Sequence, residues 1–148
     1  MNYAHYLTYP FHVKRQPEAF ALFIADASEI ILNAPEGAEL CGPNHAGQPL
    51  INNSMLTIGS TTNLGPFSLL SISIDQAWPS HRYPMMMVRT DRHVYDSVVC
   101  ACLLAFHHHF PTSQITTDGT AKDWTMGISL YEYAAQRLAP IIDFHNEQ

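Results

Sequence analysis

Apolar residues recur at helical spacing in residues 17–32. Pro17 suits the first position of a helix, and the apolar side chains fall three or four residues apart along one face. We therefore predict a helix over residues 17–32, with a strand over residues 28–33 as the alternative. The aromatic-rich residues 1–16 show no clear period, and we expect them to form an irregular arm that packs on its own domain or on a neighbour.

Alternation of apolar and polar residues marks the middle of the chain. The pattern predicts strands in residues 54–60, 67–75 and 83–90, and in the second of these Leu70, Ile72 and Ile74 share one face. Turn residues separate the three segments, so an antiparallel meander is the simplest arrangement. The preceding residues 34–54 are rich in Pro, Gly and Asn and read as a turn-rich loop.

The strongest helical pattern follows the third strand. From Val98 to Phe106 no residue is polar apart from two cysteines, so this helix is apolar on almost every side and should be covered on several of them. Thr90 or Asp91 can cap its start, and Pro111 prevents its continuation.

A second amphipathic segment lies near the end of the chain, after a short strand or turn at residues 113–119. Thr120 is the expected N-cap, with Asp123 three residues later in a relation similar to a capping box, and Pro140 closes the helix. One face of this helix carries Trp124, Ile128, Tyr131, Ala135 and Leu138.

These elements predict an α+β fold: a mainly antiparallel sheet with a central apolar helix and a C-terminal helix packed on one face. The N-terminal helix is an addition to this plan. The 148 residues contain no repeat, linker or low-complexity segment, so we expect one domain over residues 1–148 with the aromatic arm at 1–16.

The charge of the chain limits the classes of partner that the protein can be expected to bind. Charged residues make up 14% of the chain, below the usual value of about 25%, and the net charge is −6 with only two lysines. Extended nucleic-acid binding needs a basic surface that is absent here. Sparse charge and abundant aromatic residues favour a homo-oligomer. No apolar stretch reaches membrane-spanning length and no signal-peptide pattern opens the chain, so we expect a cytoplasmic protein without a membrane partner.

The histidine triplet His107–His109 and the cysteines are the most obvious candidates for metal chemistry. Consecutive helical residues point about 100° apart, so the three imidazoles fan outward and do not converge on one ion. Cys100 and Cys102 also point away from each other and read as small buried hydrophobes. We expect no metal site and no cofactor, and interpret the histidines as favourable residues at a helix C-terminus, with a smaller chance of a ligand or catalytic role.

The start of the apolar helix is the better candidate for binding. Two arginines lie next to a predicted helix N-terminus, where backbone N–H groups attract anions. The turn at Asp118 and the following Trp124 form a second candidate, in which the indole supplies an apolar or stacking surface. The predicted ligand-binding residues are Arg89, Arg92, Tyr95, Asp96, Asp118 and Trp124.

The last sixty or so residues resemble a pattern found in small uncharacterised bacterial and phage-encoded proteins. In that pattern Tyr95 and Asp96 open a long apolar helix, a turn such as Thr117-Asp118-Gly119 follows, and a tryptophan and a Leu-Tyr pair mark the last helix. The histidine triplet and the Met-rich strand depart from it, and a weaker similarity covers residues 31–51. The resemblance implies a phage or mobile-element accessory protein and carries no known activity.

Together these observations predict a non-enzymatic binding protein that engages a small anionic ligand or a host protein. One alternative is a small hydrolase that uses His107 or His109 with Asp118. The other is a structural component that assembles as a homo-oligomer, with the aromatic arm exchanged between subunits.

Overall fold

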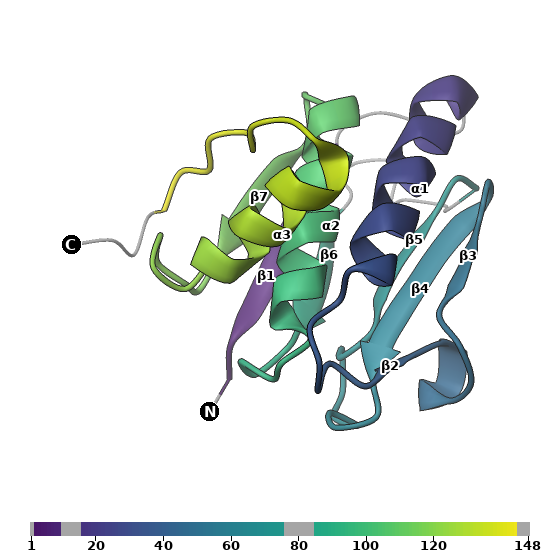
Figure 1. The fold of residues 1–148 in the computed structure, drawn as a ribbon, viewed down its shortest axis with the longest axis vertical. Helices are drawn as coiled ribbons and strands as arrows, with labels where there is room; N and C mark the ends of the chain where they lie inside the picture. The colour runs from purple at the N-terminus through teal and green to yellow at the C-terminus, as the bar shows by residue number, and fades with distance from the viewer. Residues whose placement is uncertain (1, 10–15, 76–84, 145–148) are drawn as a thin grey trace.

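Helix α2 (Asp96–His109) lies at the centre of the fold and is covered on several sides, as its sequence predicts. The computed structural model describes residues 2–9, 16–75 and 85–144. In it, α2 lies between α1 (Pro17–Leu32) and α3 (Thr125–Ala135), and two antiparallel sheets pack behind the three helices (Figure 1). Every α2 residue from Ser97 to Phe106 is buried. The predicted α+β class is confirmed.

The first sheet is built around β1 (Ala4–Thr8), which contradicts the irregular arm expected for residues 1–16 in its first half. Residues 10–15 of that arm lie outside the described residues. β1 pairs antiparallel with β6 (Met85–Arg89) on one side and with β7 (Gln114–Thr117) on the other. Alternate β1 side chains, from Tyr3 to Tyr9, are buried. The expected aromatic packing therefore exists, but it comes from the central strand of a sheet.

The second sheet contains four strands from the middle of the chain. β4 (Met55–Ser60) pairs antiparallel with β2 (Leu40–Cys41), β3 (Leu50–Asn52) and β5 (Leu70–Ser73). A short 3-10 helix, η2 (Pro43–His45), joins β2 to β3. The predicted β4–β5 hairpin is confirmed, whereas β6 leaves the expected meander to join β1, and β2 and β3 occupy part of the predicted loop.

Two of the three helices begin later than their sequence patterns suggest. α1 has the predicted bounds, and the strand alternative at residues 28–33 is wrong. α2 begins at Asp96 because Asp91 and Arg92 have positive φ angles, +49° and +61°, which no right-handed helix contains. Neither Thr90 nor Asp91 is therefore its N-cap.

Helix α3 begins at Thr125 and not directly after Thr120. The predicted side-chain bond is present: Asp123 Oδ2 accepts the Thr120 backbone N–H at 2.9 Å. This bond fixes a turn before the helix, whose N-cap is Trp124. At the other end, Gln136 adopts a left-handed conformation, so α3 ends before Leu138, whose side chain is exposed.

Gly127 allows α2 and α3 to approach closely. A Cβ atom at position 127 would lie 2.5 Å from the Cys100 Cβ and 3.3 Å from the Ser97 carbonyl oxygen. Helices in such close contact have no room for one additional methyl group, since buried packing is dense.

We predict that Gly127→Ala lowers the free energy of unfolding by about 1–3 kcal/mol, because the methyl group forces the helices apart. The alanine gains at most about 1 kcal/mol of helix propensity. Chemical denaturation measures the change. Ser129→Ala, on the exposed side of the same helix, is the control and should be neutral or slightly stabilising. Equal effects of the two substitutions would contradict the close contact.

Candidate functional site

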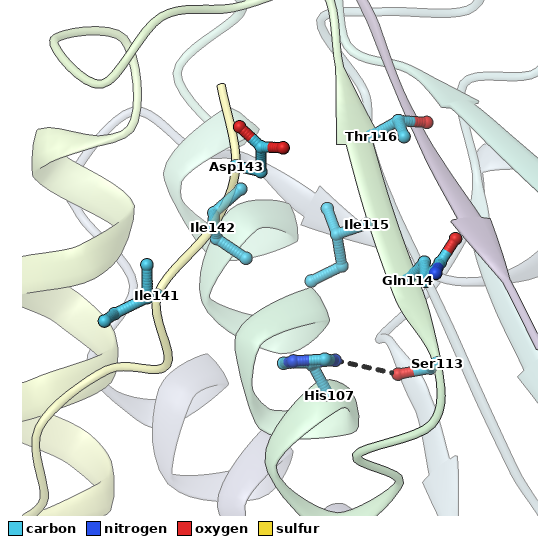
Figure 2. A pocket seen from close by; sticks show the side chains of 8 residues that line it. All are labelled: His107, Ser113, Gln114, Ile115, Thr116, Ile141, Ile142 and Asp143. Atoms are coloured by element: carbon cyan, nitrogen blue, oxygen red, sulfur yellow. Dashed lines mark hydrogen bonds between the residues drawn. The ribbon is translucent and has the colours of Figure 1, made fainter. Parts of the chain in front are cut away.

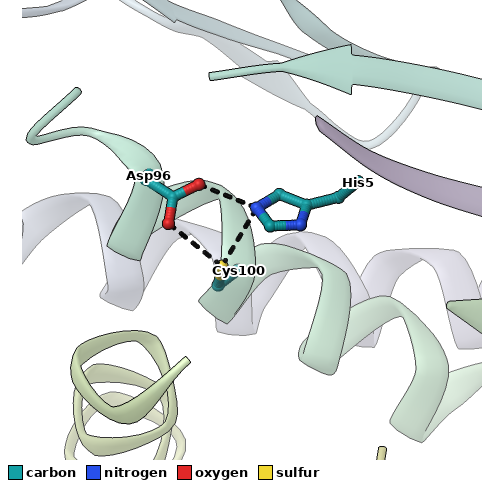
Figure 3. Close-up of side chains that lie close together, drawn as sticks. All are labelled: His5, Asp96 and Cys100. Carbon is teal, nitrogen blue, oxygen red and sulfur yellow. Dashed lines mark hydrogen bonds and ion pairs between the residues drawn. The ribbon is translucent and has the colours of Figure 1, made fainter. Parts of the chain in front are cut away.

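A buried polar cluster joins β1 to the first turn of α2. His5 Nε2 lies 2.7 Å from Asp96 Oδ1 and 3.5 Å from Cys100 Sγ, and Cys100 Sγ lies 3.6 Å from Asp96 Oδ2 (Figure 3). Asp96 and Cys100 are one helical turn apart, so both side chains project from the same face of α2. Thr90 completes the cluster by donating its hydroxyl proton to Asp96 Oδ1 at 2.5 Å.

Hydrogen bonds to Thr117 determine which nitrogen of His5 carries the proton. Thr117 Oγ1 accepts the Gly119 backbone N–H at 3.0 Å and the Trp124 indole N–H at 3.1 Å. A hydroxyl oxygen has two lone pairs and one proton. Its proton is therefore the one that bonds His5 Nδ1, at 2.7 Å, and Nδ1 is the acceptor. We infer that His5 is the neutral Nε2–H tautomer and donates to Asp96.

The cluster lacks the arrangement of a catalytic triad. In a Cys-His-Asp triad the two imidazole nitrogens serve different partners, one the nucleophile and the other the carboxylate. Here Asp96 and Cys100 both approach Nε2, while Nδ1 faces Thr117. Burial, reinforced by the charge of Asp96, raises the pKa of the Cys100 thiol well above its ordinary value. Cys100 is thus a buried hydrogen-bond donor and is no reactive thiolate.

The same three side chains have donor atoms that a metal ion accepts. Tetrahedral zinc with ordinary bond lengths separates a nitrogen and a sulfur ligand by about 3.5 Å, close to the distances from Cys100 Sγ to His5 and Asp96. A metal on His5 Nε2 requires the proton on Nδ1. Thr117 has no lone pair left to accept that proton, so its hydrogen bonds disfavour a metal here.

An open groove runs along the outer side of this cluster. It has a volume of about 590 Å³ and is formed by the turn before α2, the first turns of α2 and α3, and the start of the chain. Its wall consists of Tyr3, Arg92, His93, Val94, Asp96, Ser97, Lys122, Asp123 and Met126. Asp96 belongs to both the cluster and the groove, with 14% of its side chain exposed.

The turn before α2 holds Arg92 in the groove wall. Asp91 and Arg92 are both left-handed, a conformation that costs a non-glycine residue about 1 kcal/mol or more. Asp91 Oδ1 accepts the Tyr3 backbone N–H at 2.9 Å, which fixes the turn against β1. The Arg92 guanidinium then lies 4.0 Å from the centre of the Tyr3 ring and pairs with Asp123.

Of the six residues predicted to bind ligand, the structure brings two into the groove. Arg92 and Asp96 line it. Arg89 donates its Nε–H to both oxygens of Asp91, and Asp118 accepts the Ala4 backbone N–H at 3.0 Å. These two side chains bond to the turn before α2 and to β1, and neither of them lines the groove.

Tyr95 and Trp124 lie fully in the core, which removes the expected stacking surface. The Tyr95 hydroxyl donates to the Ser68 carbonyl oxygen at 2.7 Å and accepts from Asn63. The Trp124 indole packs edge-on against His5 and donates to Thr117. Because each polar atom already has a partner inside the protein, these two residues position the site and do not offer surface to a ligand.

His107 and His109 have separate hydrogen-bond partners, and neither partner is Asp118. His107 Nδ1 lies 3.1 Å from Ser113 Oγ, beside a smaller pocket (Figure 2). His109 Nε2 lies 2.7 Å from Asp26, which also pairs with Arg137. All three occupy the last turn of α2, as predicted. Burial lowers the pKa of His107 and of His108.

Sequence reasoning missed Tyr3 and His5. Both belong to the alternating segment YAHYLTY, in which Tyr3, His5, Leu7 and Tyr9 share one face of β1. That alternation is a strand signal, although a polar histidine in the buried series hides it. Their partners are about 90 to 115 residues away, so no local spacing could reveal them.

Comparison of the chain with protein-family models, with curated proteins and with solved structures finds no match. In the part of the chain that the structure describes, no helix combines the length and apolar character needed to cross a membrane.

We predict that Thr117→Val lowers the free energy of unfolding by about 2–4 kcal/mol, because three buried polar atoms lose one shared partner. Denaturant titration measures the loss. Thr116→Val is the matched control: it lies next along β7, where side chains alternate between faces, and should change stability by less than about 0.5 kcal/mol. Similar losses in both variants would show that the Thr117 hydroxyl does not organise the cluster.

Zinc should not stabilise the protein through the cluster. We predict that one equivalent of zinc changes the melting temperature of the wild-type chain and of Cys100→Ser equally, since a ligand raises stability only where it binds the folded state. A zinc-dependent increase that Cys100→Ser abolishes would show that the protonation of His5 differs from the one inferred.

Proposed function

We propose that the protein is a non-enzymatic binding protein, and that the groove beside α2 takes a small anionic ligand with an apolar portion. The observation that carries this proposal is the composition of the groove wall, which places two cations beside exposed apolar side chains. Its volume of about 590 Å³ lies within the range of small-molecule sites.

Lys122 is the cation best able to receive an anion. It is exposed, and the ion pairs among the described residues do not include it. Arg92 uses one of its terminal nitrogens for Asp123, and a guanidinium has five N–H donors. A carboxylate or phosphate between these two residues would receive charge-assisted hydrogen bonds.

Val94 and Met126 provide the apolar part of the wall. Their side chains are 51% and 67% exposed, and both line the groove. Covering such surface is favourable by roughly 25 cal/mol for each Å² removed from water. A ligand with a short aliphatic portion would therefore gain affinity from the same groove that holds its anionic group.

Binding is favoured over hydrolysis because the described contacts do not place a base beside a reactive nucleophile. The Cys100 thiol is buried, and His5 donates its Nε2 proton to Asp96. His107 and His109 bond to Ser113 and Asp26, whereas Asp118 bonds to the Ala4 backbone N–H. A general base must lie within hydrogen-bond reach of the proton that it removes.

The test is a titration with 4-methylpentanoate, a small aliphatic carboxylate, followed by calorimetry and by chemical-shift mapping. We expect shifts at the groove residues and about fivefold weaker binding by Lys122→Ala. Lys122→Arg keeps the charge and should bind within twofold of the wild type. Absence of binding, or an affinity insensitive to Lys122→Ala, would overturn the proposal.

A further inference from the structure

The hydroxyl of Tyr3 is a buried polar group without a partner. Tyr3 is 3% exposed and lines the groove, and its hydroxyl oxygen makes no hydrogen bond among the described residues. It lies against Gly119, where an added Cβ would be 2.2 Å from the hydroxyl oxygen and 3.1 Å from the Cβ of Asp123. Such a group costs about 1–3 kcal/mol unless something bonds to it, so its retention at a groove wall suggests a ligand contact.

Asp96, on the same groove wall, is the second candidate contact for a ligand. His5 is neutral, because Thr117 donates to its Nδ1. Within the described residues no lysine or arginine pairs with Asp96, and the nearby Arg92 is hydrogen-bonded to Asp123. Among the described residues, the donor to Asp96 Oδ2 is the weak thiol of Cys100. The helix N-terminus stabilises this carboxylate, but one of its oxygens still has capacity to accept.

The groove as a whole is electrically balanced. Two carboxylates, Asp96 and Asp123, face it together with two cations, Arg92 and Lys122. A purely anionic ligand would satisfy the cations and be repelled by Asp96. A ligand with both charges would satisfy both sets.

We infer that the inner end of the groove binds a primary ammonium group through Asp96 and the Tyr3 hydroxyl oxygen. The ligand class is then a small zwitterion, an amino acid with an apolar side chain: its ammonium group meets Asp96, its carboxylate meets Lys122 and its aliphatic part covers Val94 and Met126. This inference rests on the proposed function, since it assigns the second charged group of the same ligand. An ammonium group has three N–H donors, which suits two separate oxygen acceptors.

Three probe molecules of similar shape test the ammonium contact and the carboxylate contact one at a time. L-leucine carries both, 3-methylbutylamine has only the amine, and 4-methylpentanoate has only the carboxylate. We expect L-leucine to bind at least tenfold more tightly than either of the other two, because it alone engages both ends of the groove.

Tyr3→Phe tests the inner end directly. The substitution removes a hydroxyl that has no partner in the protein, so the variant should fold with unchanged or higher stability. We expect L-leucine and 3-methylbutylamine to bind about tenfold more weakly, the effect of one hydrogen bond to a charged group, and 4-methylpentanoate to bind as before. Tyr133→Phe, on exposed α3 surface outside the groove wall, is the control and should change none of the three affinities.

Asp96→Asn provides a second variant, with folding checked by circular dichroism, and should abolish the preference for L-leucine over 4-methylpentanoate. Binding of 4-methylpentanoate that is as tight as that of L-leucine, or amine affinity unaffected by Tyr3→Phe, would overturn the inference and leave the proposed anion site standing. Amine binding without carboxylate binding would overturn the proposed anion site and the zwitterionic ligand with it, and would leave only the ammonium contact at Asp96 and Tyr3. Failure of all three probes to bind would overturn both.

Discussion

The hydroxyl group of Thr117 is the interaction on which the rest of the site depends. It accepts one backbone and one indole N–H, and its single proton must therefore go to His5. That proton sets the tautomer of His5, and the tautomer fixes the donor that Asp96 receives. One oxygen on an edge strand thus determines the chemistry of a carboxylate at the first turn of the central helix. The same oxygen joins β1, β7 and the turn before α3, so fold and site share one constraint.

The sequence predicts a helix or strand correctly where its apolar pattern fits only one kind of element. α1 has the predicted bounds because its apolar positions repeat without interruption and Pro17 marks the start. The buried stretch of α2 is equally clear. The sequence does not show β1 clearly, because a histidine and three tyrosines stand where a buried strand usually has aliphatic residues, and the elements that bury them lie far away in the sequence. The meander prediction, which places β6 next to β5, is wrong for a related reason, since β6 pairs with β1. Antiparallel pairing is chosen by side-chain packing over the whole domain, and adjacency in sequence is only a guide.

Only part of the groove wall can be predicted from the sequence. Arg92 and Asp96 lie beside the N-terminus of the apolar helix, where an arginine can add to the attraction for an anion, and both line the groove. An indole such as that of Trp124 can stack on a ligand, but this one is buried and donates its N–H to Thr117. Whether an aromatic side chain faces solvent depends on what packs over it, and no local pattern in the sequence contains that information. Lys122 and Tyr3 enter the groove only because the turn before α3 and the start of β1 meet there.

Asp91 and Arg92, the two left-handed residues before α2, form the turn that places Arg92 in the groove wall. The turn costs backbone energy, which is offset by bonds from Asp91 to the Tyr3 backbone and to Arg89. Those bonds leave the Arg92 guanidinium over the Tyr3 ring and hold it against Asp123. Local strain, an unpartnered hydroxyl and a carboxylate without its own cation all occur within this short region. Each is unfavourable for stability alone, and their coincidence on one groove wall is the physical argument for proposing a ligand site on this surface.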